Sequence, residues 1–231
     1  MSWLVMVKLL VGLLLVTYVT RQAGRPDRFA GRWFAARMNA SHSSLTDWAL
    51  ADHGALPEAR ILDVGCGGGR TVAKLVARSH GFAVHGVDYA PGSVLLTRDT
   101  NAQSITQGRV AVVRAAVSRL PYRDATFGLV TAIESHYYWP TPEDDLREIV
   151  RTLTPGGRVL VVAELYAHGP FAGVNRAVMA MLGGRAWTAE QHRRWFESAG
   201  LADVEVRTEP SRGWIAVTGR RSTAEVEPSD P

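Results

Sequence analysis

The fold is decided by the stretch Ile61-Leu62-Asp63-Val64-Gly65-Cys66-Gly67-Gly68-Gly69-Arg70. An apolar strand carries a carboxylate near its end and passes through a glycine-rich turn into a helix, which is the pattern of a nucleotide-binding βα unit. Gly65 and Gly67 let the backbone pass close to a ligand at the helix N-terminus. Arg70 stands where the dinucleotide fingerprint has its last glycine, so the tight helix packing of pyrophosphate binders is not specified.

Two carboxylates indicate which ligand this turn would take. Asp63 lies beside the turn, where it would repel a diphosphate and attract the ammonium group of a ligand that carries an amino acid. Asp88 ends the apolar run 83–87, about one βα unit further on, and from there an acidic side chain can accept both ribose hydroxyls. NAD enzymes share the second carboxylate, but together with Asp63 and Arg70 the pattern favours S-adenosyl-L-methionine.

Four segments, in this order, resemble the class I S-adenosylmethionine-dependent methyltransferases, and more narrowly the small bacterial ones. The resemblance covers roughly residues 31–219 and is carried by ILDVGCGGGR (61–70), GVDYAPGSV (86–94), LPYRDATFGLVTAIESHYYWP (120–140) and LTPGGRVLVVAE (153–164). It implies an α/β fold: a Rossmann-like, doubly wound, mostly parallel sheet of seven strands with an antiparallel C-terminal edge strand.

The resemblance also implies which residues contact the cosubstrate. Gly65 and Gly67 would face its methionine part, Asp63 its amino group and Asp88 its ribose. Tyr89 would cover one face of the adenine, and Val117 would approach its other edge. The expected cofactor-binding residues are Asp63, Gly65, Cys66, Gly67, Asp88, Tyr89, Val117 and Ile133.

Two positions depart from the family pattern and keep other functions open. Ala116 replaces the Asp that in many members holds the adenine amino group, and Gly128 replaces the Asp of the usual FDLV motif. These departures prompt the alternative of a non-catalytic protein that still binds S-adenosylmethionine. An NAD-dependent oxidoreductase is disfavoured by Arg70 and by the lack of a Ser-Tyr-Lys arrangement.

Strands and helices alternate beyond the glycine turn, which predicts a parallel sheet covered on both faces. Strands are expected at 60–64, 83–88, 109–114, 127–133, 157–164, 202–207 and 214–219, and helices at 70–79, 91–104, 142–152 and 188–199. The last two strands lack a helix between them, so they should form a hairpin. Pro155-Gly156-Gly157 is expected to form a turn before its strand, and segment 165–190 an apolar cover.

The run Glu134-Ser135-His136-Tyr137-Tyr138-Trp139-Pro140 begins at the carboxyl end of the fourth expected strand, where open α/β sheets bind ligands. Its aromatic faces suit a cationic methyl donor, through cation–π attraction. Methyl transfer depends on alignment, and a general base is needed only for a hydroxyl, thiol or protonated amine acceptor. His136 is our first candidate for this base, ahead of Glu134 and Glu164, with Tyr137 beside the reacting methyl.

Each of these candidates also has a structural interpretation. Glu134 could orient the amino group of the cosubstrate, His136 could cap a turn, and Glu164 could be a solvated strand end. Tyr137 and Trp139 could pack the loop against helices formed by residues 25–60, which the family places over the cosubstrate. The seven histidines of the chain form no metal-ligand spacing, so no metal site is predicted.

The composition indicates one catalytic domain and disfavours nucleic acid as a partner. The 231 residues, 46% of them hydrophobic, can bury one core. A single cysteine excludes a disulfide framework. Of the net charge of +4, residues 1–40 contribute +5 and the remainder −1, so the domain is not basic. The expected partner is a small-molecule or lipid-like methyl acceptor.

The basic N-terminal region contains an apolar run, residues 3–19, which as a helix would extend about 26 Å. This length is marginal for a hydrocarbon core of ~30 Å. The arginines behind it would keep the domain on the cytoplasmic face of a membrane. A soluble packed helix and a cleaved signal peptide are the alternatives. We therefore expect a membrane anchor at 1–20, a methyltransferase domain at 21–219 and a disordered tail at 220–231.

Overall fold

The computed structural model describes residues 43–51, 56, 59–81, 83–169 and 172–223. The anchor expected at 1–20 lies outside this part of the chain, as do residues 224–231 of the expected tail. Among the described residues, no helix is both long and apolar enough to cross a membrane. The last strand continues to Arg221, so the tail cannot begin at residue 220 as expected.

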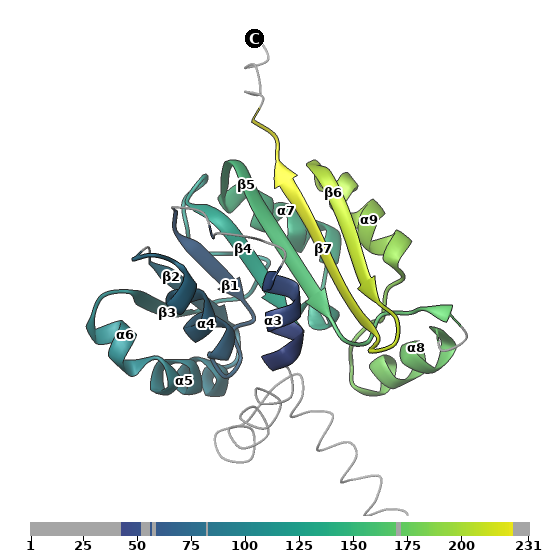
Figure 1. The fold of residues 1–231 in the computed structure, drawn as a ribbon, viewed down its shortest axis with the longest axis horizontal. Coiled ribbons are helices and arrows are strands. Elements are labelled where there is room, and N and C mark those ends of the chain that lie inside the picture. The colour runs from purple at the N-terminus through teal and green to yellow at the C-terminus, as the bar shows by residue number, and fades with distance from the viewer. Residues whose placement is uncertain (1–42, 52–55, 57–58, 82, 170–171, 224–231) are drawn as a thin grey trace, which may run out of the picture.

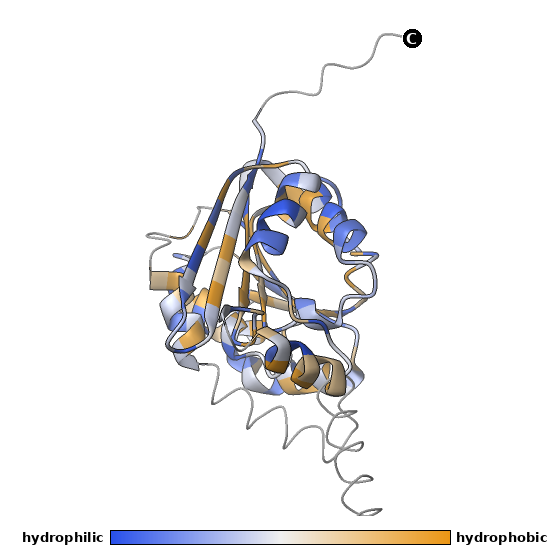
Figure 2. Ribbon diagram, turned by 90° about the vertical axis from the view of Figure 1, so that its right-hand side faces the viewer, coloured by the Kyte–Doolittle hydropathy of each residue, from blue (hydrophilic) through white to orange (hydrophobic). Residues whose placement is uncertain are grey.

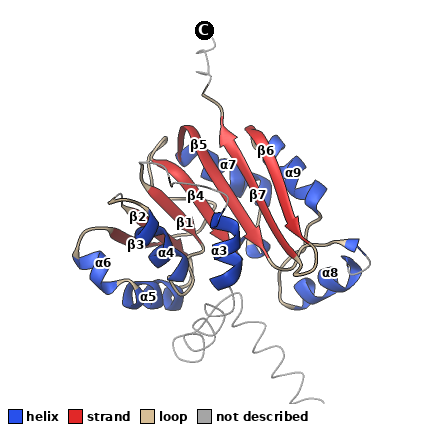
Figure 3. Ribbon diagram, viewed as in Figure 1, coloured by secondary structure: helices blue, strands red, loops and turns tan. Residues whose placement is uncertain are grey.

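Seven strands form one sheet in the order β3-β2-β1-β4-β5-β7-β6, as Figures 1 and 3 show. All neighbours pair in parallel except at β7, which is antiparallel to β5 and β6. The sequence-based prediction of a seven-stranded, mostly parallel sheet is confirmed. The strands are β1 (Ile61–Val64), β2 (Val84–Asp88), β3 (Val110–Arg114), β4 (Phe127–Ile133), β5 (Leu153–Ala163), β6 (Leu201–Glu209) and β7 (Trp214–Arg221).

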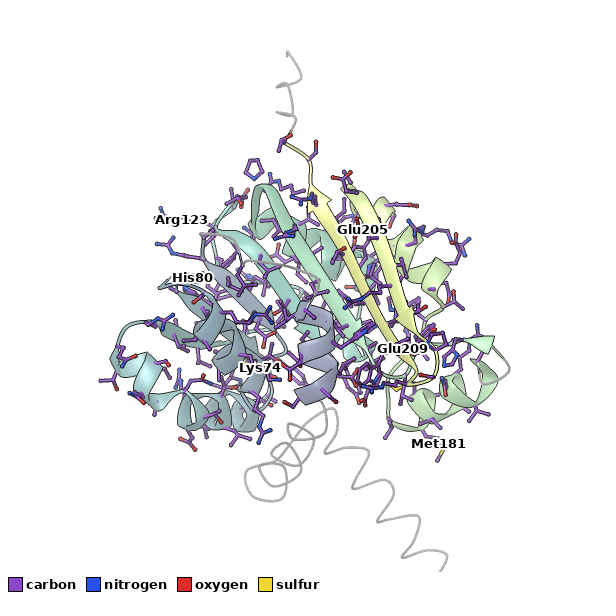
Figure 4. All side chains as sticks on the ribbon, in the orientation of Figure 1. Lys74, His80, Arg123, Met181, Glu205 and Glu209 are labelled. Atoms are coloured by element: carbon purple, nitrogen blue, oxygen red, sulfur yellow. The ribbon has the colours of Figure 1, made fainter. Side chains whose placement is uncertain are left out.

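The antiparallel strand does not lie at the edge, which corrects the expected position. β6 and β7 form the predicted hairpin, but β7 inserts between β5 and β6 and leaves β6 outermost. Burial explains this order, since residues 214–217 of β7 are all buried. β6 instead carries charged side chains, including Glu205 and Glu209 in Figure 4, which suit an exposed edge.

Helices cover both faces of the sheet. They are α3 (Ser43–Ala51), α4 (Arg70–Arg78), α5 (Pro91–Thr100), α6 (Ala102–Thr106), α7 (Pro142–Thr152), α8 (Ala172–Met181) and α9 (Ala189–Ser198). One core cluster joins the sheet to α3, α4 and α5, and the other joins it to α7, α8 and α9. The expected helix 91–104 ends early because the Asn101 amide donates to the carbonyls of Gly69 and Thr97.

Side chains of β5 alternate between the two core clusters, as a strand covered on both faces requires. Val159 and Val161 face the cluster of α7 and α9, whereas Leu160 and Val162 face that of α3 and α4. α3 thus packs on the sheet through its buried leucines, whereas the family resemblance placed helices of residues 25–60 over the cosubstrate.

The expected turn at residues 155–157 is an irregularity inside β5. Phe127 pairs with Leu153 but Leu129 pairs with Arg158, so β5 has extra residues against β4. Gly156 takes φ 74° within this irregularity.

Candidate active site

The glycine loop between β1 and α4 folds back onto the end of β2. The backbone N–H groups of Gly65 and Cys66 donate to the Val87 carbonyl at 2.8 and 3.0 Å. The Cys66 side chain points into the core, where Thr97 Oγ1 lies 3.4 Å from its sulfur. Burial raises the pKa of this thiol well above its usual value, so it stays protonated. A ligand in this loop would contact the Cys66 backbone.

Three glycines of the loop have positive φ, but their surroundings differ. A Cβ on Gly65 would collide with Ser135, and a Cβ on Gly69 would lie 2.8 Å from Thr97 Cα. A Cβ on Gly67 would meet only the Gly65 carbonyl oxygen, at 3.9 Å. Gly67 therefore faces open space, and a ligand can approach the backbone there.

Asp88 connects this loop to the start of α5. Its Oδ2 accepts from the Gly67 backbone N–H at 3.0 Å, and its Oδ1 accepts from the Ala90 N–H at 2.8 Å. Burial raises the pKa of Asp88, while these N–H donors lower it. The carboxylate thus lies at the carboxyl end of β2, beside the open side of Gly67.

Asp63 lies inside the sheet. It faces Thr131 on β4, whose hydroxyl donates to Asp63 Oδ1 at 2.6 Å, and only 2% of the residue is exposed. Burial raises its pKa to about 7, the Thr131 hydrogen bond lowers it, and the nearby Asp88 raises it further. A contact between Asp63 and the amino group of the cosubstrate stays a prediction.

A hydrogen-bonded network joins the ends of β4 and β5. Glu134, with φ 56°, accepts through Oε1 from the Tyr137 hydroxyl at 2.9 Å and from the Glu164 backbone N–H at 2.5 Å. The Tyr137 oxygen accepts in turn from the Leu165 N–H at 3.0 Å. Burial raises the pKa of Glu134 to about 8, against the lowering effect of the Glu164 N–H. Glu134 is therefore mostly protonated at neutral pH.

His136 is buried against α9, and is not open to a ligand as the sequence analysis expected. Its ring is 1% exposed, in the 3₁₀ helix η1 (His136–Tyr138), and its Nε2 lies 3.0 Å from Nε2 of His192 on α9. His192 Nδ1 lies 2.8 Å from the Thr188 carbonyl and must donate to it, so the proton between the two rings belongs to His136. Burial lowers the pKa of both histidines, that of His192 to about 4.

Tyr138 is half-buried at the end of η1, and the sequence analysis named it only as part of the run 134–140. Burial raises its pKa to about 12, and both Glu134 and Tyr89 are close enough to raise it further. Tyr89, directly after β2, is 41% exposed. Side chains turn by about 120° per residue in a 3₁₀ helix, so Tyr137 and Tyr138 of η1 point in different directions. If residues 136–138 had been treated in the sequence as a turn with three residues per turn, Tyr137 and Tyr138 would have been predicted to point in different directions.

Comparison with known proteins shows which family part of the chain matches. Residues 62–161 match the family model described as a methyltransferase domain. This match and the curated relatives support a class I S-adenosylmethionine-dependent methyltransferase. These matches confirm the resemblance seen in the sequence.

Its curated relatives are longer proteins. Methyltransferase GfsG of Streptomyces halstedii is 36% identical over 120 residues, which cover 52% of this chain and 42% of the relative. The 27-O-demethylrifamycin SV methyltransferase of Amycolatopsis mediterranei (strain S699) is 29% identical over 162 residues, which cover 66% of this chain and 59% of the relative. The chain thus spans about half the length of the curated relatives it matches.

A solved structure shows the same fold. The phospholethanolamine N-methyltransferase 2 of Haemonchus contortus has a TM-score of 0.72 at 16% identity, and the match covers 84% of this chain and 57% of that one. That structure contains S-adenosylhomocysteine and phosphomonomethylethanolamine.

The remaining expected site residues of this methyltransferase lie around the same strand ends. Val117 is half-buried after β3, Ile133 is 9% exposed at the end of β4, and Glu164 accepts from the Trp214 indole N–H at 3.3 Å. Ala116 is exposed, and the Gly128 N–H donates to the Arg60 carbonyl. Contacts of Val117 and Ile133 with a cosubstrate stay predictions. Among the described residues, no group of three His, Cys, Asp or Glu could hold a metal ion.

Proposed function

We propose that this chain transfers the methyl group of S-adenosylmethionine to a small-molecule or lipid-like acceptor. The observation that carries the proposal is the Asp88 carboxylate beside the open side of Gly67. A Cβ-free backbone and a carboxylate at the carboxyl end of β2 together suit a ligand with ribose hydroxyls. When bound, S-adenosylmethionine supplies an activated methyl group that a nucleophile takes by in-line displacement.

Residues at the end of β4 are placed to serve the acceptor side. We assign Glu134 as the base that takes the proton of a hydroxyl, thiol or ammonium acceptor, because a pKa of about 8 matches that task near neutral pH. Tyr137 is a positioning residue, since its hydroxyl is shared between Glu134 and the Leu165 N–H. The rings of Tyr89 and Tyr138 exclude water and attract a cationic donor.

The general-base role expected for His136 is not part of this proposal. A base must reach the proton that it removes, and the His136 ring lies between η1 and α9. Burial also lowers its pKa well below 6.5, which weakens it as a base. We infer that His136 fixes η1, and with it Tyr137 and Tyr138.

Small acceptors are supported by what the relatives act on. The rifamycin relative is named for a small natural product, and the Haemonchus contortus structure holds a small phosphorylated amine.

Calorimetry with S-adenosylhomocysteine tests the cosubstrate assignment. The Asp88→Ala variant should bind about 1.5–3 kcal/mol more weakly than the parent, because charge-assisted hydrogen bonds to ribose are lost. Asp124→Ala is the matched control, since Asp124 pairs with Arg151 away from the glycine loop and should leave affinity unchanged. Equal affinity of the Asp88 variant and the parent, or tight binding of NADH, would reject the assignment.

The location of the enzyme is a separate part of the proposal. We place the domain on the cytoplasmic face of a membrane, held by residues 3–19, on the basis of their apolar composition and of the arginines that follow. The native chain should then remain with membranes after salt and carbonate washes, while a chain that starts near Gly24 should be released and still bind S-adenosylhomocysteine. Recovery of the native chain without detergent would support a packed helix instead.

A further inference from the structure

Helix α8 exposes an apolar stripe. Val174, Val178 and Met181 are 58%, 38% and 66% exposed and follow one another at helical spacing. They are three of the five large hydrophobic residues that are exposed in the described part of the chain. In Figure 2, α8 is coloured mainly as hydrophobic, in contrast to the mainly hydrophilic α9 above it.

The other side of α8 packs on the fold near Tyr137. Met179 is buried and lies close to Gly184, since a Cβ added to Gly184 would be only 2.7 Å from Met179 Cε. The same added Cβ would be 3.1 Å from Tyr137 Cβ, so Gly184 packs between Met179 and Tyr137. Asn175 holds the helix from another direction, by donating to the Tyr166 carbonyl at 2.8 Å. The stripe therefore faces away from the fold, as the Met181 side chain does in Figure 4.

The charges around α8 favour one kind of surface as the partner of this stripe. Residues 165–189 contain no Asp or Glu, and their two arginines, Arg176 and Arg185, are exposed. The chain from residue 41 onward carries a net charge of −1, so this basic segment is local. α8 itself carries one charged residue, Arg176, and Arg185 follows four residues after its end. An apolar stripe with basic side chains near it suits the interface of an anionic lipid bilayer.

We propose that α8 contacts the surface of an anionic bilayer, with the stripe among the acyl chains and Arg176 and Arg185 at the headgroups. A second copy of the chain fits less well, because a stable dimer buries about 1,600 Å² and the stripe belongs to a helix only about 15 Å long. One consequence rests on the proposed function: a methyl acceptor that resides in the bilayer would enter beside Tyr137, on the inner side of α8.

A fluorescent label on α8 tests the contact in the full chain. Cys66 is the only cysteine and is buried, so a Met181→Cys variant takes an environment-sensitive thiol label at one place. Addition of phosphatidylglycerol vesicles should shift the label emission to the blue, more than addition of phosphatidylcholine vesicles does. Arg176→Glu combined with Arg185→Glu should reduce the shift, and added salt should do the same.

The matched control is a Leu95→Cys variant with the same label. Leu95 is 43% exposed on α5, in no segment with this charge pattern, and its label should not shift. No shift at residue 181 on vesicles that have bound the chain, or equal shifts at both positions, would overturn the proposal. A shift that grows with protein concentration without vesicles would overturn it in favour of a second copy. S-adenosylhomocysteine affinity, measured on the labelled chains, reports failure of the proposed chemistry separately.

Discussion

Replacing Gly65 by alanine is expected to lower the free energy of unfolding by about 2–5 kcal/mol. About 1–2 kcal/mol comes from a Cβ at φ 75°, in the left-handed region. A further 1–3 kcal/mol or so comes from overpacking, because the new Cβ lies directly against Ser135 Cβ and 2.8 Å from its Oγ. Ser135 is held in place by its hydrogen bond to the Val64 carbonyl. The collision thus pushes the loop after β4 away from the glycine loop.

Gly67→Ala is the matched control, since Gly67 also has positive φ, at 51°, but no neighbour that a Cβ would strike. It should lower stability by only about 1–2 kcal/mol. It should nevertheless abolish detectable S-adenosylhomocysteine binding, because the methyl group fills the space where we place the ligand. Urea unfolding measures the first effect and calorimetry the second.

A second substitution isolates the collision at residue 65. Ser135→Gly removes the side chain that the new Cβ strikes, so Gly65→Ala should be less destabilising in that background than in the parent. Additive effects of the two substitutions would show that strain at φ 75° alone explains the loss. Unchanged ligand affinity of Gly67→Ala would place the cosubstrate elsewhere.

The glycine turn, Asp88 and the parallel sheet could be predicted from the sequence because short local patterns specify them. A glycine turn between an apolar strand and a helix has few other solutions, and Asp88 follows one βα unit later. The alternation of strands and helices predicted a covered parallel sheet, and burial on both faces of β5 bears this out. The hairpin of β6 and β7 was likewise predicted, because the sequence has no helix between these two strands.

Other features depend on tertiary contacts that no local pattern encodes. β7 lies between β5 and β6, although β6 precedes it in the chain, and this position buries residues 214–217. His136 lies in a run of aromatic residues that looked like one cleft wall, yet its partner His192 is 56 residues away on α9. Tyr138 was not distinguished from the rest of this run, since only the turn of η1 gives its side chain a different direction from that of Tyr137.

Glu134 combines the two kinds of evidence, because the sequence placed it at the end of β4 and the structure gives its environment. Burial and the nearby Glu164 raise its pKa from 4.5 to about 8, so the folded protein holds a proton that the unfolded chain releases. The contribution of Glu134 to stability is therefore full below pH 4.5 and falls as the pH rises towards 8. Deprotonation near pH 8 would, by contrast, supply the base that a hydroxyl acceptor requires.

Glu134→Gln should separate these two effects. The amide oxygen can still accept from the Tyr137 hydroxyl and the Glu164 N–H, so stability at pH 6 should be close to that of the parent and should not fall as the pH rises to 9. With a hydroxyl acceptor, kcat should fall by about 10²–10⁴-fold, and the rise of parent activity up to about pH 8 should disappear. S-adenosylhomocysteine affinity should stay within a few-fold.

Two further variants sharpen the interpretation of this result. Tyr137→Phe keeps the ring but removes the hydroxyl, so it should lower kcat less than Glu134→Gln while preserving the pH profile. His136→Gln should lower stability without removing the activity rise towards pH 8, because the His136 ring is buried against His192 and Trp195 of α9. Parent-like kcat of Glu134→Gln across the pH range would remove Glu134 from proton transfer, and alignment of donor and acceptor alone would then account for the rate.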